Sequence, residues 1–278
     1  MQSAEPIRDE VISANIAFYR EIAEKYDQYE SCASEKYYQQ MLDADLDKMQ
    51  AQLPAGSIHC LDCGGGSGNL TLKMLKRGWR VTVVDVSPDM LELSKAKVRA
   101  NGYCAEFVND SIENFLSCNH HFFSVITFSS VLHHLYSPVS VIKEVAMNVR
   151  PGGFFYSNFD PVRPSSRFLA TCFYNVDTIL AKALRDRKDL LPGILRRVRK
   201  FRLTPDPAHN RAVGSPGDLA EYHARTGLDD RLIVETLEQQ GFVVDLEHYP
   251  VGRTKPMLWG NRWLRAMLNF KIVSQRKI

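Results

Sequence analysis

Four glycines stand within five positions of the stretch Cys60–Leu70 (CLDCGGGSGNL), between an apolar run and a sequence of helical character. Glycine adopts positive φ readily and lets a ligand approach the backbone with no Cβ in the way. A helix that begins directly after such a loop offers unpaired N–H groups to an anionic or polar ligand. The loop at residues 64–68 is therefore predicted to be a ligand cradle, although glycine would also serve a simple tight turn.

The spacing of these glycines excludes the dinucleotide-binding fingerprint. The pattern G-x-G-x-x-G needs glycine in its sixth place, which is Asn69 when counted from Gly64 and Thr71 when counted from Gly66. The pyrophosphate-binding turn of a nucleotide-dependent oxidoreductase is thus not predicted. The sequence instead has an acid followed by alternating glycines, D-x-G-x-G-x-G, beginning at Asp62.

Two further acids stand at the ends of the next apolar runs. Asp85 closes VTVVD and follows Gly68 by 17 residues. That is near the separation at which a strand-end carboxylate reaches the hydroxyls of a ribose. Asp110 closes FVND. Each acid has a structural alternative: Asp85 could lie in a surface turn, and Asp110 could cap the helix that follows, since aspartate is favoured at that position.

The elements that position these residues follow from hydrophobic periodicity. Between residues 58 and 160, short apolar runs that end in Gly or Asp alternate with helical stretches. The predicted strands are 58–61, 81–84, 106–108, 124–129 and 154–158, and the predicted helices are 69–77, 88–101, 112–116 and 137–149. A helix at 229–240 and strands at 242–250 and 270–277 follow later. This order predicts a doubly wound α/β fold with a seven-stranded, mostly parallel, Rossmann-like sheet, whose parallel strands end at the ligand site.

The pattern at residues 62–68 resembles motif I of the class I S-adenosylmethionine-dependent methyltransferases. The stretch FSVITFSSVLHHLYSPVSVIKEVAMNVRPGGFFYSNF resembles the pattern of the small-molecule branch of that family, in which a strand, an LHHL segment and a helix precede RPGG; quinone-pathway and natural-product enzymes fall in this branch. The resemblance covers about residues 15–160. It implies a methyltransferase with S-adenosylmethionine as its cofactor.

In that family the motif I acid faces the methionine amine, the acid after the second strand holds both ribose hydroxyls, and an acid after the third strand contacts adenine. The resemblance assigns these roles to Asp62, Asp85 and Asp110. An apolar residue such as Met90 often packs on the adenine there, although a methionine on a helix face is as readily a core residue. The cofactor-binding residues expected from the resemblance are Asp62, Gly64, Gly65, Gly66, Gly68, Asp85, Val86, Met90, Asn109, Asp110, Ser111 and Ser129.

Methyl transfer to a hydroxyl or an acidic carbon is helped by a base, and histidine suits neutral pH. His134 follows the fourth predicted strand, and related O-methyltransferases often have histidine there, so we expect it to be the catalytic base. A structural histidine bonded to backbone carbonyls is the alternative. A metal is unnecessary for this chemistry. Substrate-binding residues are expected at Tyr19, Tyr26, His133, Asn158 and Asp160, with a turn-forming role open for the last two.

Two helices, predicted at residues 8–30 and 35–53, precede the alternation, and the segment 161–217 interrupts it. We therefore expect an N-terminal helical lid at 1–53, a cofactor-binding core at 54–160, a helical cap insertion for the acceptor at 161–217, and a last segment at 218–278 that completes the core. A length of 278 residues suits one large domain with such an elaboration.

Composition limits the class of protein. The six cysteines are too few and too scattered for a disulfide scaffold, and the CxxC pair Cys60 and Cys63 has no second pair at zinc-finger spacing. No signal peptide or membrane span is evident, so a cytoplasmic protein is expected. The net charge of +3 does not by itself imply a nucleic-acid partner.

The acceptor is inferred from what the chain contains and lacks. The segment 190–203 is basic and amphipathic, which suits either a solvated cap helix or peripheral contact with an anionic membrane, and the tail WGNRWLRAMLNFK repeats the mixture. The fourth strand ends in FSSV, without the Asn/Asp-Pro-Pro-aromatic signature associated with base methylation. A small, hydrophobic acceptor methylated on oxygen is favoured, with carbon and nitrogen open. An RNA or lipid-linked acceptor, or a non-catalytic cofactor-binding scaffold, is the alternative.

Overall fold

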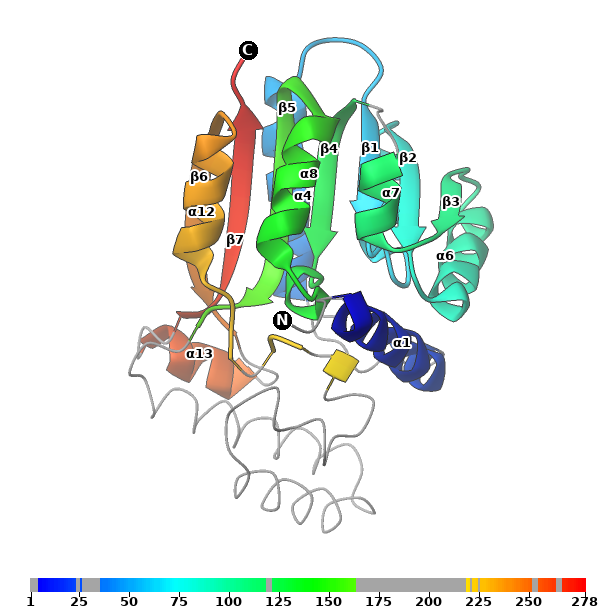
Figure 1. Ribbon diagram of the computed structural model, residues 1–278. Coiled ribbons are helices and arrows are strands. Elements are labelled where there is room, and N and C mark those ends of the chain that lie inside the picture. The colour runs from blue at the N-terminus through cyan, green and yellow to red at the C-terminus, as the bar shows by residue number, and fades with distance from the viewer. Residues whose placement is uncertain are drawn as a thin grey trace.

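The computed structural model describes residues 5–23, 26, 36–118, 122–163, 219–220, 222–224, 226–251, 255–263 and 267–278. Nearly all of the predicted cap at 161–217, including the basic segment 190–203, lies outside these residues. One sheet runs through the described part of the molecule (Figure 1). Its strands are β1 (His59–Cys63), β2 (Arg80–Asp85), β3 (Glu106–Asn109), β4 (Phe123–Ser129), β5 (Val149–Pro161), β6 (Phe242–Pro250) and β7 (Met267–Arg276).

The order of the strands is β3-β2-β1-β4-β5-β7-β6. All neighbours pair in parallel except that β7 is antiparallel to both β5 and β6. The predicted seven-stranded, mostly parallel sheet is therefore confirmed. Between β1 and β4 the order reverses direction, and the crevice outside the carboxyl ends of strands at such a point is where ligands bind in this class of sheet.

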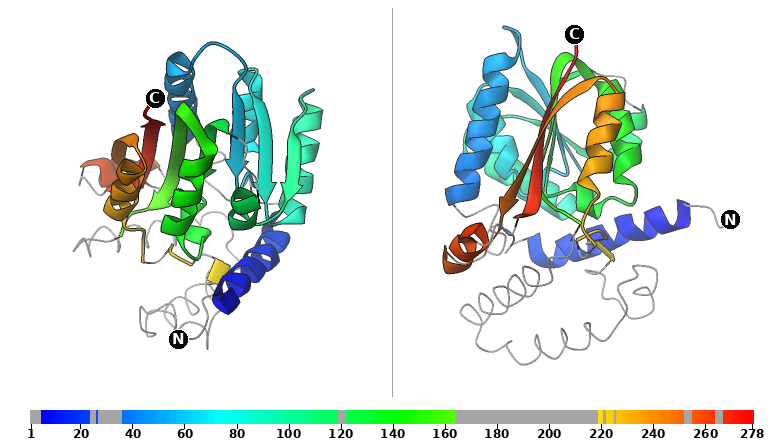
Figure 2. Two further views of the ribbon diagram at one scale, coloured as in Figure 1. Left: turned by 45° about the horizontal axis from the view of Figure 1, so that its top comes forward. Right: turned by 90° about the vertical axis from the view of Figure 1, so that its left-hand side faces the viewer.

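Helices cover both faces of the sheet, as Figure 2 shows from its edge. The helices are α1 (Glu5–Ile22), α4 (Lys36–Gln52), α5 (Asn69–Lys76), α6 (Pro88–Ala100), α7 (Ile112–Cys118), the 3₁₀ turn η2 (Leu132–His134), α8 (Pro138–Asn148), α12 (Asp230–Gln239) and α13 (Lys255–Trp263). One apolar cluster packs α7, α8 and α12 on the sheet, and the other packs α4, α5 and α6 on the opposite face. The side chains of β1 divide between them, Leu61 and Cys63 facing the first cluster and Cys60 the second, because successive residues of a strand point to opposite faces.

Three boundaries differ from the sequence prediction. The first helix begins at Glu5, earlier than predicted, and spans Glu5–Ile22, while most of residues 23–30, where the prediction ended, lie outside the described residues. Strand β5 begins at Val149, before the predicted start at Phe154, so the RPGG stretch belongs to the strand. The tail that resembled the basic segment divides between α13 and β7, where Phe270 is completely buried. Within the described residues, no helix combines the length and the apolar character that a bilayer crossing requires.

A buried polar network holds the end of β5 in a bulge. Phe159 has a positive φ of 67°, and the register of β5 against β7 shifts between Ser157 and Asp160. The Phe159 N–H donates to Asn158 Oδ1 (2.7 Å) and to the Tyr249 hydroxyl oxygen (3.0 Å), while that hydroxyl donates to Asn158 Oδ1 (2.6 Å). These bonds stabilise a backbone conformation that phenylalanine rarely adopts. A bulge re-aims the side chains around it, and here it determines where Asp160 points.

We predict that Tyr249→Phe lowers the free energy of unfolding by about 1–2 kcal/mol, since a buried hydroxyl that both donates and accepts is lost. Urea denaturation measures the difference. The matched control is Tyr37→Phe, because Tyr37 lies on α4 and is 41% exposed. Equal denaturation midpoints for the two variants would show that the hydroxyl does not hold the bulge.

Candidate cofactor and acceptor site

Two connected hollows lie where the glycine loop meets the carboxyl ends of the strands. The larger, here called the main pocket, has about 730 Å³ of empty space including its open mouth, within the usual range for small-molecule sites. The smaller, here called the loop hollow, has about 430 Å³ and shares Tyr26, Gly64, Gly66 and Ser129 with the main pocket. The main pocket is lined by Arg8, Val11, Ile12, Asn15, Tyr19, Tyr26, Gly64, Gly66, Asp85, Val86, Met90, Ile112, Glu113, Ser129, Ser130, Val131, His134, Leu135 and Tyr136.

Glycine is required in the loop for two different reasons. Gly66 has a φ of 53°, and a Cβ built on it would extend toward the pocket, with the Met90 methyl carbon as its nearest neighbour at 3.6 Å. Gly65 instead faces the protein, where a Cβ would come within 2.4 Å of Val83 Cγ1. The backbone of the loop is therefore bare on the side of the pocket and tightly packed behind.

Asp85 ends β2 and borders the main pocket. Its Oδ2 accepts from the Gly66 N–H (2.9 Å) and its Oδ1 from the Ser87 N–H (2.8 Å). Burial raises the pKa of this carboxyl, and the two N–H groups oppose the rise. A carboxylate held in this way ties the glycine loop to the second strand and remains an acceptor for ligand hydroxyls.

Asp62 lies one layer deeper, on β1, and borders the loop hollow. Its Oδ2 accepts from the Thr71 hydroxyl (2.5 Å) and its Oδ1 from the Thr127 hydroxyl (2.9 Å). Burial raises its pKa to about 6, against the effect of those two hydroxyls. A cation in the loop hollow would lower this pKa again, because a nearby opposite charge favours the ionised carboxylate.

The residues after β3 do not line the pocket as the sequence suggested. Asn109 donates to the backbone oxygens of Asp85 (2.9 Å) and Val86 (3.1 Å), and thus supports the end of β2 from behind. Asp110 accepts from the Asn114 amide at 2.6 Å. The described residues that line the two hollows do not include Asn109, Asp110 or Ser111. On this side of the main pocket, the wall consists of Ile112 and Glu113 from α7.

Capping of α7 falls to a different residue from the one suggested. Ser111 Oγ accepts from the Asn114 N–H (3.1 Å), so Ser111 caps the helix. The sequence had suggested this capping role for Asp110.

Gly68, which was expected to bind the cofactor, also lies outside both linings in the described part of the chain. It precedes α5 with a φ of 79°, and Ser94 Oγ would lie 2.4 Å from its Cβ.

Helix α1 forms the outer wall of the main pocket. It crosses below the carboxyl ends of the strands (Figures 1 and 2), and residues of one of its faces line the pocket. The lining residues of that face are Arg8, Val11, Ile12, Asn15 and Tyr19. Their spacing of three and four residues is that of one side of a helix. Sequence reasoning identified only Tyr19 of this set, although the spacing itself was visible.

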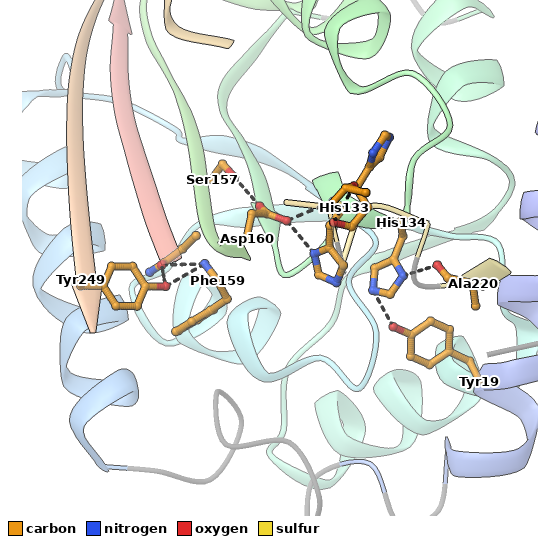
Figure 3. A network of polar contacts seen from close by, with 11 residues as sticks. Tyr19, His133, His134, Ser157, Phe159, Asp160, Ala220 and Tyr249 are labelled. Carbon is orange, nitrogen blue, oxygen red and sulfur yellow. Dashed lines mark hydrogen bonds and ion pairs between the residues drawn. The ribbon is translucent and has the colours of Figure 1, made fainter. Parts of the chain in front are cut away.

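His134 ends η2 with both ring nitrogens engaged (Figure 3). Its Nδ1 lies 2.7 Å from the Ala220 carbonyl oxygen, and its Nε2 lies 2.9 Å from the Tyr19 hydroxyl. A carbonyl can only accept, so Nδ1 carries the proton, and in the neutral ring Nε2 accepts from Tyr19. Burial, with a smaller effect of neighbouring His133, lowers the pKa of His134 well below its ordinary value. The side chain thus offers an unprotonated nitrogen in the pocket wall.

Two of the expected substrate-binding residues are buried behind the pocket. Asn158 and Asp160 are fully buried, and neither is among the described residues that line the hollows. Asn158 holds the bulge, and Asp160 accepts from His133. His133 is itself buried and absent from those linings, so of the predicted acceptor residues the main pocket brings together Tyr19, Tyr26 and His134.

Neither cysteine of the CxxC pair is exposed, since Cys60 and Cys63 are both buried in the core. In the described residues, no group of three or more His, Cys, Asp or Glu side chains is arranged to hold a metal ion.

Comparison with known proteins identifies the domain that carries this site. Residues 61–157 match the model of a methyltransferase domain, and they contain the glycine loop, Asp85 and His134. Over these residues the chain is similar to the class I S-adenosylmethionine-dependent methyltransferases. The plantazolicin methyltransferase BpumL, solved in complex with SAH, shares the fold with a TM-score of 0.55 at 15% identity, over 99% of this chain and 98% of that one. The resemblance read from the sequence is therefore confirmed.

Two curated relatives match parts of this chain. The tRNA 5-carboxymethoxyuridine methyltransferase of Escherichia coli K12 is 27% identical over 171 residues, which are 60% of each protein. The ubiquinone biosynthesis O-methyltransferase of Vibrio cholerae is 31% identical over 96 residues, 34% of this chain and 39% of that protein. The chain thus spans less than two thirds of the length of either relative.

Proposed function

We propose that this protein transfers a methyl group to a hydroxyl oxygen of a small, moderately hydrophobic organic acceptor. The observation that carries the proposal is the unprotonated Nε2 of His134 in the wall of the pocket that Gly66 and Asp85 also border. Bound S-adenosylmethionine would supply a methyl group activated on a sulfonium. The protein's own residues then have to bind, orient, exclude water and move one proton.

The cofactor end of the pocket fits a nucleoside with an amino acid attached. Gly66 leaves the backbone bare where a Cβ would otherwise project, and Asp85 presents a carboxylate to the two hydroxyls of a ribose. Asp62 borders the adjoining hollow, where it would favour a positively charged amine. We assign the binding of S-adenosylmethionine to these three residues, with Val86 and Met90 at the adenosine side.

The acceptor end combines apolar side chains with the pair formed by His134 and Tyr19. Its walls are apolar side chains from α1 and from the segment after β4, namely Val11, Ile12, Val131 and Leu135. The Tyr19 hydroxyl donates to His134 Nε2 at 2.9 Å, the geometry that an acceptor hydroxyl would need. We infer that the entering hydroxyl takes the place of Tyr19 and that Nε2 receives its proton as the oxygen is methylated. The Ala220 carbonyl keeps the ring in the correct tautomer.

An RNA acceptor is the second candidate, favoured by one specific observation. The relative that matches the longer stretch of this chain is a tRNA methyltransferase. In favour of a small acceptor, α1 lies along the pocket as an outer wall, and Arg8 is the one cationic side chain that the described residues contribute to the lining. RNA-binding surfaces are in general rich in such side chains.

The test is to find where a labelled methyl group goes. Protein and methyl-labelled S-adenosylmethionine are incubated separately with a small-molecule extract, with a lipid extract and with total RNA, and each fraction is analysed by mass spectrometry. The proposal expects one added methyl on small hydroxylated compounds, in a linkage that boron tribromide cleaves as it cleaves an aryl ether. Label confined to RNA would replace the proposal by the second candidate. Cofactor binding in calorimetry without label in any fraction would favour a non-catalytic scaffold.

A further inference from the structure

A buried carboxylate stands behind His134 and is bonded to the neighbouring histidine. Asp160 is completely buried at the end of the β5 bulge. Its Oδ1 accepts from the His133 backbone N–H (3.1 Å) and lies 2.8 Å from His133 Nδ1, and its Oδ2 accepts from the Ser157 hydroxyl (2.8 Å). Three donors thus converge on two oxygens, an arrangement that an ionised carboxylate satisfies as an acceptor only.

The His133 ring lies between this carboxylate and His134, as Figure 3 shows. The centroids of the two imidazoles are 4.1 Å apart, and their planes are inclined by 38°. The side chain of His133 is 8% exposed, and that of Asp160 is 0% exposed. Because water and salt screen buried charges only weakly, a charge on the first ring acts strongly on the second.

We propose that Asp160 and His133 form a buried ion pair whose positive end, on His133, acts together with burial to keep His134 unprotonated. Neither residue of the pair lines the pocket as described, so both are positioning residues. Where the protein works as proposed above, their effect is to fix the base of the transfer reaction in its active, neutral form. As the pH falls, His133 therefore takes a proton first, and the base, His134, takes one only under more acidic conditions.

Burial of the His134 ring is the larger cause of its lowered pKa, and the charge on His133 adds to it; the other polar groups around His134 do not. From α1, Tyr19 contributes a neutral hydroxyl, and from residue 220 a carbonyl oxygen faces Nδ1 and favours protonation. His223 donates its backbone N–H to the His133 carbonyl (2.8 Å), and burial lowers the pKa of its own ring. Across the main pocket stand Asp85, Glu113 and Arg8, of which the two acids would favour a protonated His134.

The consequence for activity is a rate that persists in mild acid. The pKa of His134 is lowered, and the active form is the unprotonated one, so the rate is full above that lowered pKa and falls only as the pH drops through it. If the ion pair is broken, the fall begins at a higher pH.

The experiment is NMR of the ¹⁵N-histidine-labelled protein, and it needs no acceptor. Signals are assigned with His133→Asn and His134→Gln. In the wild type at neutral pH, we expect both ring nitrogens of His133 to be protonated and only Nδ1 of His134. A neutral His133 under these conditions would overturn the proposal, and this measurement requires no variant of Asp160 to fold.

The variant Asp160→Asn gives a second test, because the direction in which it shifts the midpoint of His134 titration distinguishes the ion pair from a lone negative charge. Loss of the ion pair should raise the midpoint of His134 titration by about one pH unit or more. If Asp160 acted only as a lone negative charge, its removal would lower that midpoint, and a downward or absent shift therefore contradicts the proposal. The control is Ser157→Ala, which removes the other partner of Asp160 without changing charge and should move the midpoint by less than about 0.3 unit.

These titrations separate this inference from the proposed function. Midpoints that move as expected, in a protein that labels no acceptor, would leave the ion pair intact and remove the methyl transfer. Labelling of an acceptor by a protein whose His133 is neutral would support the methyl transfer and contradict the ion pair.

Discussion

Replacing His134 by glutamine slows methyl transfer about 10²–10⁴-fold and leaves the affinity for S-adenosylmethionine unchanged. Glutamine can still donate to the Ala220 carbonyl, but it has no basic nitrogen in place of Nε2. The residual rate should rise with pH, because an acceptor hydroxyl that ionises by itself needs no base. Single-turnover transfer from labelled cofactor measures the rate, and calorimetry measures the affinity.

The matched control for that variant is Tyr19→Phe. Tyr19 bonds to the same nitrogen, yet we infer that the acceptor displaces it, so its loss should change the single-turnover rate by less than about threefold. If Tyr19→Phe is as slow as His134→Gln, the proton travels through the phenol oxygen and the displacement model is wrong. If His134→Gln transfers at the normal rate, His134 only anchors the segment that carries Ala220.

The parts of this site that sequence reasoning found are those that strand ends determine. The glycine loop directly follows β1, Asp85 is the last residue of β2, and His134 lies in the short segment after β4. The carboxyl ends of these neighbouring parallel strands meet at one edge of the sheet. Local pattern and global topology therefore point to the same place. The seven-stranded, mostly parallel sheet was predicted, whereas the strand order and the antiparallel β7 between β5 and β6 are seen in the structure.

The parts that sequence reasoning missed depend on contacts between distant segments. Asn158 and Asp160 lie near the carboxyl end of β5, and both are buried at the bulge around Phe159. The hydroxyl that holds this bulge comes from Tyr249, 90 residues away. Nothing near residue 159 in the sequence announces that partner. The tautomer of His134 similarly depends on a carbonyl 86 residues later in the chain.

Replacing Asp85 by alanine should weaken the binding of S-adenosylmethionine about 100-fold or more. The carboxylate would accept from two ribose hydroxyls, and hydrogen bonds to a charged group contribute about 1.5–3 kcal/mol each. The substitution also frees the Gly66 N–H, so the loop loses its tie to β2 at the point where it approaches the ligand. Calorimetry with S-adenosylmethionine and with S-adenosylhomocysteine measures the loss, and a thermal melt checks the fold.

Two other aspartates make this prediction specific. Asp89 lies at the start of α6, with a side chain that is 40% exposed and 3.5 Å from Arg20, so Asp89→Ala should leave the affinity within about threefold of the wild type. The variant Asp110→Ala tests the role that the family resemblance implies for Asp110. Asp110 accepts a hydrogen bond from Asn114 and is not among the described residues that line either hollow. We therefore expect Asp110→Ala, like Asp89→Ala, to leave the affinity nearly unchanged. Undiminished affinity in Asp85→Ala would remove the cofactor from this strand end. A loss in Asp110→Ala as large as in Asp85→Ala would mean that the adenine lies closer to β3 than the pocket lining implies, with Asn114 giving up its bond when the cofactor enters.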